Sequence, residues 1–302
     1  MRKVIGIDLG GTGIFGAVMN ENGEILKKAE KQTPSNKGRK AVLEAIIEII
    51  ERLWSPDILG IGIGSPGCID SENGRALEIG GNISGWANTD IRGEIKKAYP
   101  NTPIYVENDA NVAGLCEAWM GAGKNLNSFV MLTLGTGVGG AIYLEDGRLI
   151  KGYNFQGAEL GHAILYPKGK ICNCGQRGCV DKYLSGHSIE EKYFELTKEK
   201  KSGKDIFKDS EKDPIAAKII EEYAEDLAIY LVSLKNIFDP QGIIIGGGVI
   251  NSKAFWWDKM LKYYKIHSNS IKSMQIVPAR YLNDAGMIGA GRIVFINEAD
   301  KK

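Results

Sequence analysis

Four side chains that commonly bind metal ions lie close together near the middle of the sequence: His162, Cys172, Cys174 and Cys179. One imidazole and three thiolates form the closed tetrahedral donor set of structural Zn²⁺ sites, which leaves no coordination position for water. The spacing therefore predicts a zinc ion that holds the surrounding loop in place and takes no part in hydrolysis. The alternative is a group of buried free thiols.

Two glycine-rich turns are candidates for binding phosphate, because glycine lets backbone N–H groups approach an anion and a threonine in each adds a hydroxyl donor. They comprise Gly10, Gly11, Thr12 and Gly13 in the first turn and residues 135–140, with Thr136 and Gly137, in the second. Neither is a Walker loop, and a strand rather than a helix is expected to follow each. The two turns predict a split phosphate clamp.

Asp8 ends a predicted strand beside the first turn, where its carboxylate could hold Mg²⁺ directly or through water. The alternative for Asp8 is a turn-capping role.

A third glycine run, Gly246, Gly247 and Gly248, ends another buried strand and could let an adenine ring lie on the backbone. A simple tight turn explains that run equally well.

Asp109 is the candidate general base, in a segment that follows a strand and opens a helix, Glu107–Asn111. Kinases use an aspartate to position a substrate hydroxyl and to accept its proton late in a loose transition state. The alternative is an N-cap that accepts backbone N–H bonds. Asn108 could serve as the cap while Asp109 points inward.

Composition places these residues in an ordinary globular chain of 302 residues with a formal net charge of +1. About 150 residues per domain suggests two domains. No apolar run approaches the ~20 residues that span a bilayer, and the N-terminus lacks a signal peptide's apolar stretch. We therefore expect a cytoplasmic protein that binds neither membranes nor nucleic acids.

The elements that must position these residues are read from hydrophobic spacing and turn signals. Helices are expected over 38–54, from Asn108 or Asp109 to Gly121, and over 214–237. Strands are expected over 3–9, 14–19, about 24–31, 58–64, 103–107, 129–134, 141–144 and 243–245. The lysine-rich stretch 198–204 is interpreted as a solvated loop, and no role is assigned to His187 or His267.

The sequence contains an internal repeat, because residues 11–27 align without gaps onto residues 135–151. Identical residues include the Gly-Thr-Gly of each turn (11–13 and 135–137), the glycine of each following hairpin (Gly23 and Gly147), and the pair Lys27 and Lys151. We interpret the repeat as two homologous α/β halves that present their turns toward a shared cleft. The alternative is that any two glycine-rich hairpins look alike.

Together these motifs resemble the ROK family of bacterial sugar kinases and sugar-sensing repressors, within the actin/hexokinase-like superfamily. The matching stretches are IGIDLGGT, GIGSPG, ENDAN, LTLGTGVGG, GAELGH, CNCGQRGC and IIIGGGV. The resemblance implies two actin/RNase H-like domains with a ligand cleft between them. The first is 1–115, completed by a helix near 285–302, and the second is 116–284, with the zinc loop and dimerisation helices of a homodimer.

The resemblance also implies roles for individual residues. Asp109 would activate the 6-hydroxyl of a sugar, and His162 would contact the sugar as well as zinc. The other implied sugar contacts are Asn82, Asn108, Glu159 and Asp181. Gly11, Thr12, Thr136 and Gly137 would face the phosphates of ATP, beside Asp8 and Gly10, with Gly246–Gly248 near the adenine.

Two positions depart from the family pattern: Asp181 stands where the family usually has glutamate, and Gly13 where it commonly has lysine.

The resemblance implies an ATP- and Mg²⁺-dependent kinase acting on the 6-hydroxyl of an aldohexose, with glucose as the first choice of acceptor. The nearest alternative is an N-acetylhexosamine kinase for GlcNAc or ManNAc. A non-catalytic sugar-sensing regulator is the alternative from another class. The family's repressors carry an N-terminal helix-turn-helix, which a first strand at residue 3 leaves no room for.

Overall fold

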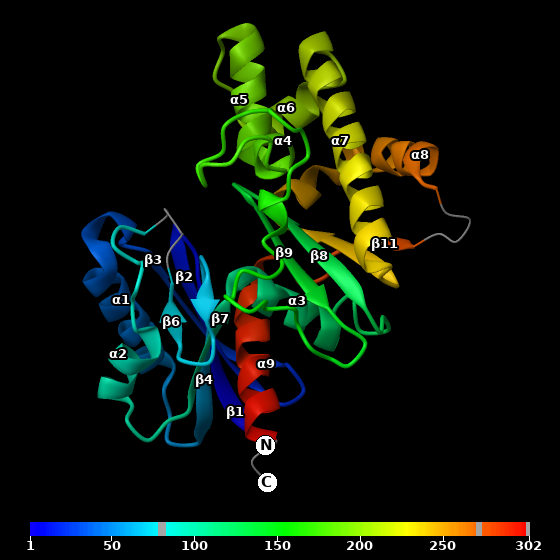
Figure 1. Ribbon diagram of the computed structural model, residues 1–302. Coiled ribbons are helices and arrows are strands. Elements are labelled where there is room, and N and C mark those ends of the chain that lie inside the picture. The colour runs from blue at the N-terminus through cyan, green and yellow to red at the C-terminus, as the bar shows by residue number, and fades with distance from the viewer. Residues whose placement is uncertain (78–82, 270–273, 300–302) are drawn as a thin grey trace. The chain divides into compact units, whose positions relative to one another are not determined.

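The computed structural model describes residues 1–77, 83–269 and 274–299, and its chain divides into two compact α/β units (Figure 1). Unit 1 comprises Met1–Asn125, Leu149–Gly157 and Asn283–Lys302. Unit 2 comprises Leu126–Arg148 and Ala158–Leu282. The boundary expected at 115 and 116 falls inside helix α3, which stays in unit 1 because it packs along the C-terminal helix α9.

Unit 1 contains a five-stranded sheet in the order β3-β2-β1-β4-β7. Its strands are β1 (Lys3–Leu9), β2 (Gly13–Asn20), β3 (Ile25–Gln32), β4 (Ile58–Ser65) and β7 (Ile104–Asn108). Strands β1, β4 and β7 are parallel, whereas β2 and β3 pair antiparallel to their neighbours. The parallel strands are buried and read as nearly continuous apolar runs, as expected for strands covered on both faces.

Helices cover both faces of this sheet (Figure 1). Side chains alternate along β1, so that Ile5 packs with the apolar stripe of helix α1 and Val4 with helix α9. Helix α9 approaches closely, since a Cβ at Gly6 would lie 2.0 Å from the Met287 carbonyl oxygen. Only glycine allows this approach. The unit's helices are η1 (Ser35–Lys37), α1 (Gly38–Leu53), α2 (Ile91–Ala98), α3 (Asp109–Met120) and α9 (Ala285–Ala299). A two-stranded ribbon is formed by β5 (Ile69–Asp70) and β6 (Arg75–Ala76).

Unit 2 contains a four-stranded sheet in the order β11-β10-β8-β9. Its strands are β8 (Phe129–Leu134), β9 (Val138–Tyr143), β10 (Gly242–Gly246) and β11 (Gln275–Pro278). Strand β10 is parallel to both β8 and β11, and β9 pairs antiparallel to β8. The helices are η2 (Leu160–His162), α4 (Asp181–Leu184), α5 (Gly186–Thr197), α6 (Gly203–Asp209), α7 (Pro214–Phe238), η3 (Gly248–Phe255) and α8 (Trp257–His267), and the short η4 (Leu282–Asp284) falls at the boundary with unit 1.

Helix α7 is the longest of the described helices, and its ends follow local rules. The Asp213 side chain caps its start by accepting the N–H of Ile215 at 2.8 Å, and proline occupies the first helical position. The helix ends at Asp239, which adopts the left-handed conformation with φ of 42°. No helix in the described part of the chain is both long and apolar enough to cross a membrane.

The internal repeat corresponds to two hairpins of the same design, β1–β2 and β8–β9. The first loop closes with Gly10 N–H donating to the Gly13 carbonyl at 2.9 Å, the second with Gly135 donating to Gly137 at 2.9 Å. One sequence prediction is wrong here, since residues 138–140 belong to β9 rather than to the turn. Two glycines weaken the strand signal locally, but pairing with β8 supplies the hydrogen bonds.

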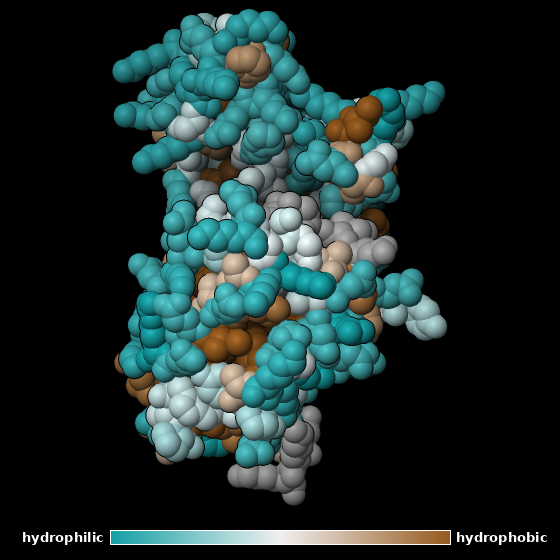
Figure 2. Space-filling view, turned by 90° about the vertical axis from the view of Figure 1, so that its left-hand side faces the viewer, coloured by the Kyte–Doolittle hydropathy of each residue, from teal (hydrophilic) through white to brown (hydrophobic). Residues whose placement is uncertain are grey.

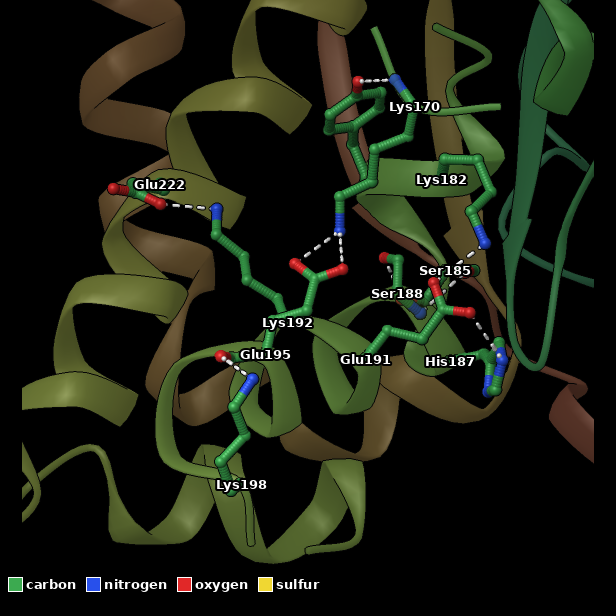
Figure 3. Close-up of polar contacts among 11 residues, drawn as sticks. Lys170, Lys182, Ser185, His187, Ser188, Glu191, Lys192, Glu195, Lys198 and Glu222 are labelled. Carbon is green, nitrogen blue, oxygen red and sulfur yellow. Dashed lines mark hydrogen bonds and ion pairs between the residues drawn. The ribbon is translucent and has the colours of Figure 1, made fainter. Parts of the chain in front are cut away.

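The surface of unit 2 over α5 and α6 is mostly hydrophilic (Figure 2), although Phe194 and Leu196 of α5 are exposed. Ion pairs tie helix α5 to its neighbours: Lys192 to Glu222 of α7, and Lys170 to Glu195 at 3.0 Å (Figure 3). The lysine-rich stretch before α6 is only partly the solvated loop that was predicted. Its last residues, Gly203 and Lys204, open α6, with Ser202 as the cap.

Candidate active site

The candidate base and magnesium ligand of unit 1 lie at one edge of its sheet. In the parallel register, Asp8 of β1 is level with Gly64 of β4, and Ser65 of β4 is level with Asn108 of β7. The carboxyl ends of these strands therefore meet, which is where open α/β sheets bind ligands. Asp8 and the first residue of α3, Asp109, are consequently close enough for their charges to interact.

The start of helix α3 separates capping from chemistry. Asn108 is the cap, because its Oδ1 accepts the N–H of Asn111 at 3.1 Å, and its Nδ2 donates to the Gly67 carbonyl at 3.1 Å. Asp109 is the first helical residue, half-buried, with Oδ1 accepting the N–H of Ala110 at 2.7 Å. The reading of Asp109 as the N-cap is thus ruled out.

Glu107, which precedes the cap, is a buried carboxylate with a complete set of partners. Its Oε1 accepts the N–H of Asn108 at 3.0 Å and the Nδ2 of Asn111 at 3.1 Å, and its Oε2 pairs with Lys151 Nζ at 2.7 Å. Lys151 also donates to Ser71 Oγ at 2.8 Å. Sequence reasoning noted Lys151 only as a repeat position, because nothing local reveals a partner 44 residues away (151 − 107).

Asp8 has a perturbed carboxyl group. Burial, and secondarily the negative charge of Asp109, raise its pKa from 3.8 to about 7. The first turn of α9 gives it room, because a Cβ at Gly286 would lie 2.3 Å from Asp8 Oδ2. A desolvated carboxylate beside a second acid fits a hard divalent cation such as Mg²⁺, which would offset both charges.

The raised pKa of Asp8 predicts a pH-dependent stability. Between about pH 4 and 7 native Asp8 holds a proton that the unfolded chain releases, so this group's contribution falls as pH rises through that window. Asp8→Asn removes the titration. Relative to wild type, it is expected to gain ~2–3 kcal/mol of stability on going from pH 5 to pH 8.

Urea unfolding of both proteins at the two pH values, without added metal, measures this gain. Glu44→Gln, on the exposed face of α1, makes the same charge change outside the site and serves as the control. An Asp8→Asn effect that is equal at both pH values contradicts a raised pKa.

Gly13, where the family commonly has lysine, lies beside an aromatic side chain. A Cβ at Gly13 would lie 2.8 Å from ring atoms of Phe15, which is partly exposed. A longer side chain at this position would therefore require the Phe15 ring to move.

Unit 2 holds a cavity of about 610 Å³ beside its own glycine turn. This volume suits a nucleotide-sized ligand. The wall is formed by the turn after β8, the starts of α5 and α6, and η3. The lining residues are Gly135, Thr136, Gly186, His187, Glu190, Ser202, Gly203, Lys204, Phe207, Lys208, Gly248, Val249, Asn251, Ser252 and Phe255.

The third glycine run takes part in this cavity through one of its residues. Gly248 lines the wall, whereas Gly246 ends β10 and Gly247, with φ of 82°, packs on the Leu134 carbonyl. The run therefore forms a tight turn and also contributes to the cavity wall. The tight turn and a contact with a bound ligand do not exclude each other. Whether adenine lies on this run stays a prediction.

Sequence reasoning missed the cavity residues His187, Lys204 and Lys208. His187 points toward Glu191 of its own helix, with Nε2 3.1 Å from Oε1 (Figure 3). The available signal was the capping serine at 185 followed by glycine, which marks a helix start. It does not reveal that this helix start adjoins the turn after β8.

The four predicted metal ligands converge in unit 2. One ligand atom from each of His162, Cys172, Cys174 and Cys179 lies within 4.8 Å of the others. Cys174 Sγ and Cys179 Sγ are 3.6 Å apart, and Cys172 Sγ is 3.8 Å from His162 Nδ1. Tetrahedral Zn²⁺ with ~2.3 Å Zn–S bonds places sulfurs ~3.8 Å apart, so the set fits zinc.

Hydrogen bonds from a neighbouring side chain, Gln176, to the candidate ligands also favour a metal at this position. Gln176 donates to the His162 carbonyl at 3.1 Å and lies 3.5 Å from Cys174 Sγ. Burial raises the pKa of Cys172 and of Cys179. Burial also opposes ionisation of Cys174, but hydrogen bonds from Gln176 and the other cysteines lower its pKa to about 7. A thiol that ionises easily is a ready metal ligand.

The predicted sugar contacts of unit 2 lie near its glycine turn. Helix η2, which follows Glu159 and contains His162, packs directly on β9, since a Cβ at Gly161 would lie 2.1 Å from the Val138 carbonyl oxygen. Asp181, whose predicted sugar contact stays a prediction, accepts the N–H of Val138 at Oδ1, at 2.8 Å. Asn82, another predicted contact, lies outside the described residues.

The fold and the site together define an α/β protein of the actin/hexokinase-like class. The model of the ROK family matches residues 4–295, and this chain belongs to that family. The glucokinase of Thermotoga maritima is 34% identical, with 97% of each chain covered. The N-acetyl-D-glucosamine kinase of Vibrio cholerae is 32% identical, covering 94% of this chain and 97% of that protein.

Solved structures extend the similarity to three dimensions. The ROK hexokinase of Thermus thermophilus superimposes with a TM-score of 0.88 at 32% identity, covering 99% of this chain and 100% of that one. A Streptomyces griseus ROK glucokinase, crystallised with glucose and AMPPNP, gives a TM-score of 0.83 at 29% identity, covering 96% and 98%. The predicted family and α/β fold class are thereby confirmed.

Proposed function

We propose that this protein transfers a phosphoryl group from ATP to the 6-hydroxyl of an aldohexose, with glucose as the preferred acceptor. The observation that carries the proposal is the start of α3, where Asn108 caps the helix and Asp109 is left out of the capping role. Full-length similarity to glucokinases supports the choice of acceptor.

In the proposed reaction, Asp109 accepts a hydrogen bond from the sugar 6-hydroxyl. The bond from O6 to the γ-phosphorus forms while the bond from that phosphorus to the β,γ-bridging oxygen breaks. The hydroxyl proton passes to Asp109, and ADP leaves with the electron pair of the broken bond. Because the transition state is loose, Asp109 contributes by positioning O6 as much as by taking the proton.

The donor's phosphates are assigned to the two glycine turns, through Gly11 and Thr12 of unit 1 and Thr136 and Gly137 of unit 2. The cavity of unit 2 takes the nucleoside. Mg²⁺, when bound, neutralises phosphate charge, and Asp8 would hold it.

The sugar is assigned to Asn108, Glu159 and His162, with Asn82 as a further contact. His162 can serve both sites because its Nδ1 faces Cys172, which leaves Nε2 for a hydroxyl. The zinc set would fix the loop that carries these residues. We also propose that the protein is a cytoplasmic homodimer, as the family resemblance implies.

A second candidate is an N-acetylhexosamine kinase, favoured by the similarity to the Vibrio cholerae enzyme. Initial rates of ADP release, measured by a coupled assay with glucose, mannose, GlcNAc, ManNAc and fructose, distinguish the two. We expect the highest kcat/KM for glucose. A higher value for GlcNAc or ManNAc replaces the first candidate with the second. Sugar binding without turnover of any of the five identifies a sensor.

A further inference from the structure

Asp181 directly contacts the backbone of the second glycine turn. Its Oδ1 accepts the N–H of Val138, the residue that follows the turn, at 2.8 Å. A Cβ at Gly137 would lie 3.0 Å from the same oxygen. The carboxylate therefore packs against the peptide units that the proposed function assigns to the donor's phosphates.

The short helix that carries Asp181 is tied to this turn at both ends. At its start Asp181 bonds Val138, and two residues after its end Gly186 donates its N–H to the Gly135 carbonyl at 2.7 Å. Between them, Lys182 pairs with Glu191 of α5 at 2.8 Å, with only 13% of the lysine side chain exposed (Figure 3). Helix α4 is thus a fixed support behind the turn.

We propose that Asp181 is a positioning residue for the phosphoryl donor, an inference that rests on the proposed function. By holding the Val138 N–H, the carboxylate fixes the orientation of the turn's peptide groups, Thr136 and Gly137. Preorganised N–H groups bind phosphate more tightly than groups that must first be ordered. The site also carries glycine at 137 because a side chain there would crowd Asp181 Oδ1.

The hydrogen bond between Asp181 and Val138 also connects the loop of the four candidate metal ligands to the second glycine turn. Asp181 follows Cys179 by two residues, and Val180 donates its N–H to the Ala163 carbonyl at 2.8 Å, next to His162. The loop that the zinc set would close is therefore continuous with the support of the turn. A metal ion held by these four side chains would therefore also hold the support of the turn in place.

Asp181→Ala and Asp181→Asn test the proposal, because asparagine keeps an Oδ1 that can accept the Val138 N–H and alanine does not. Asp146→Ala is the matched control, since Asp146 supports the turn that follows β9 by accepting the Arg148 N–H at 3.0 Å. For each protein, calorimetry measures the Kd of AMPPNP without sugar, and tryptophan fluorescence measures the Kd of glucose without nucleotide.

We expect Asp181→Ala to weaken AMPPNP binding and to raise the KM for ATP about tenfold, with the Kd of glucose changed less than about twofold. Asp181→Asn is expected to stay within about threefold of wild type for AMPPNP, as is the Asp146→Ala control. A glucose Kd that rises while AMPPNP binding holds overturns the proposal, and so does an unchanged AMPPNP Kd in Asp181→Ala.

If Asp181→Ala does not fold, Asp181→Leu and Asp181→Asn provide the contrast, because leucine has about the size of asparagine but no atom that can accept the Val138 N–H. AMPPNP binding that is weakened in Asp181→Leu but retained in Asp181→Asn then supports the positioning role. Equal AMPPNP binding by these two variants refutes it. Failure of the proposed function is separate, since it appears as AMPPNP binding by wild type with no turnover of any sugar.

Discussion

Asp109→Asn is expected to lower kcat about a thousandfold and to leave glucose binding within about threefold of wild type. Asparagine has nearly the same shape as aspartate, so Asn108 continues to cap α3. The arrangement at the carboxyl ends of the parallel strands of unit 1 is therefore unchanged. Asparagine cannot accept the proton of the sugar hydroxyl. Coupled ADP release gives kcat, and tryptophan fluorescence gives the glucose Kd.

The matched control for this prediction is Asp90→Asn. Asp90 caps helix α2 of the same unit by accepting the Gly93 N–H at 2.9 Å, and asparagine caps equally well. We expect this variant to retain wild-type turnover. Turnover by Asp109→Asn comparable to that of Asp90→Asn would refute Asp109 as the base.

Asp109→Asn has a second expected consequence, at Asp8. The negative charge of Asp109 is one of the two causes that raise the pKa of Asp8, and burial is the larger. Removing that charge should therefore lower the pKa of Asp8 without returning it to 3.8. A smaller stability loss between pH 5 and pH 8 than in wild type is the expected observation, by the same urea unfolding.

Cys179→Ser is expected to abolish metal binding and to lower the unfolding free energy by several kcal/mol, because structural Zn²⁺ contributes its binding energy to folding. Cys179 is fully buried among the four ligand atoms. Its loss should also reduce kcat/KM more than tenfold, since Glu159, His162 and Asp181 all adjoin the loop. Elemental analysis of protein purified without chelators should find about one zinc per wild-type chain.

Cys116→Ser is the matched control for metal binding. Cys116 is buried in unit 1, outside the cluster, so the same atomic change removes a buried thiol without removing a ligand. We expect it to keep the zinc and to lose only ~1–2 kcal/mol of stability. Wild-type protein without zinc would instead favour the reading of the cluster as buried free thiols.

The sequence was most informative where the signal is local. The helix expected over 214–237 is Pro214–Phe238, because the cap, the proline and the apolar spacing all lie within the segment itself. The strand expected over 129–134 is Phe129–Leu134. Asparagine was a candidate cap for α3 because its side chain can reach N–H groups two or three residues ahead. The four metal ligands converge because their spacing forces a tight loop.

Local patterns were uninformative about β9 and α6. Residues 138–140 read as a turn, since glycine is a poor strand former, yet the partner strand β8 supplies the hydrogen bonds. The stretch before α6 reads as a solvated loop because its charges are considered without partners. Lys201 in fact pairs with Asp209 at 2.9 Å, which ties that stretch to the helix that follows.

The roles of individual polar groups depended most on the tertiary structure. Sequence alone predicted the two similar glycine-turn hairpins, the cluster of four candidate metal ligands, and the acid next to an asparagine cap, because each depends on residues near one another in the chain. It could not determine that Lys151 neutralises Glu107, that His187 and Lys204 line the cavity, or that Asp181 bonds the Val138 N–H. Those contacts join segments that meet only after the chain has folded, and a hydrogen bond forms with the nearest partner in space rather than in sequence.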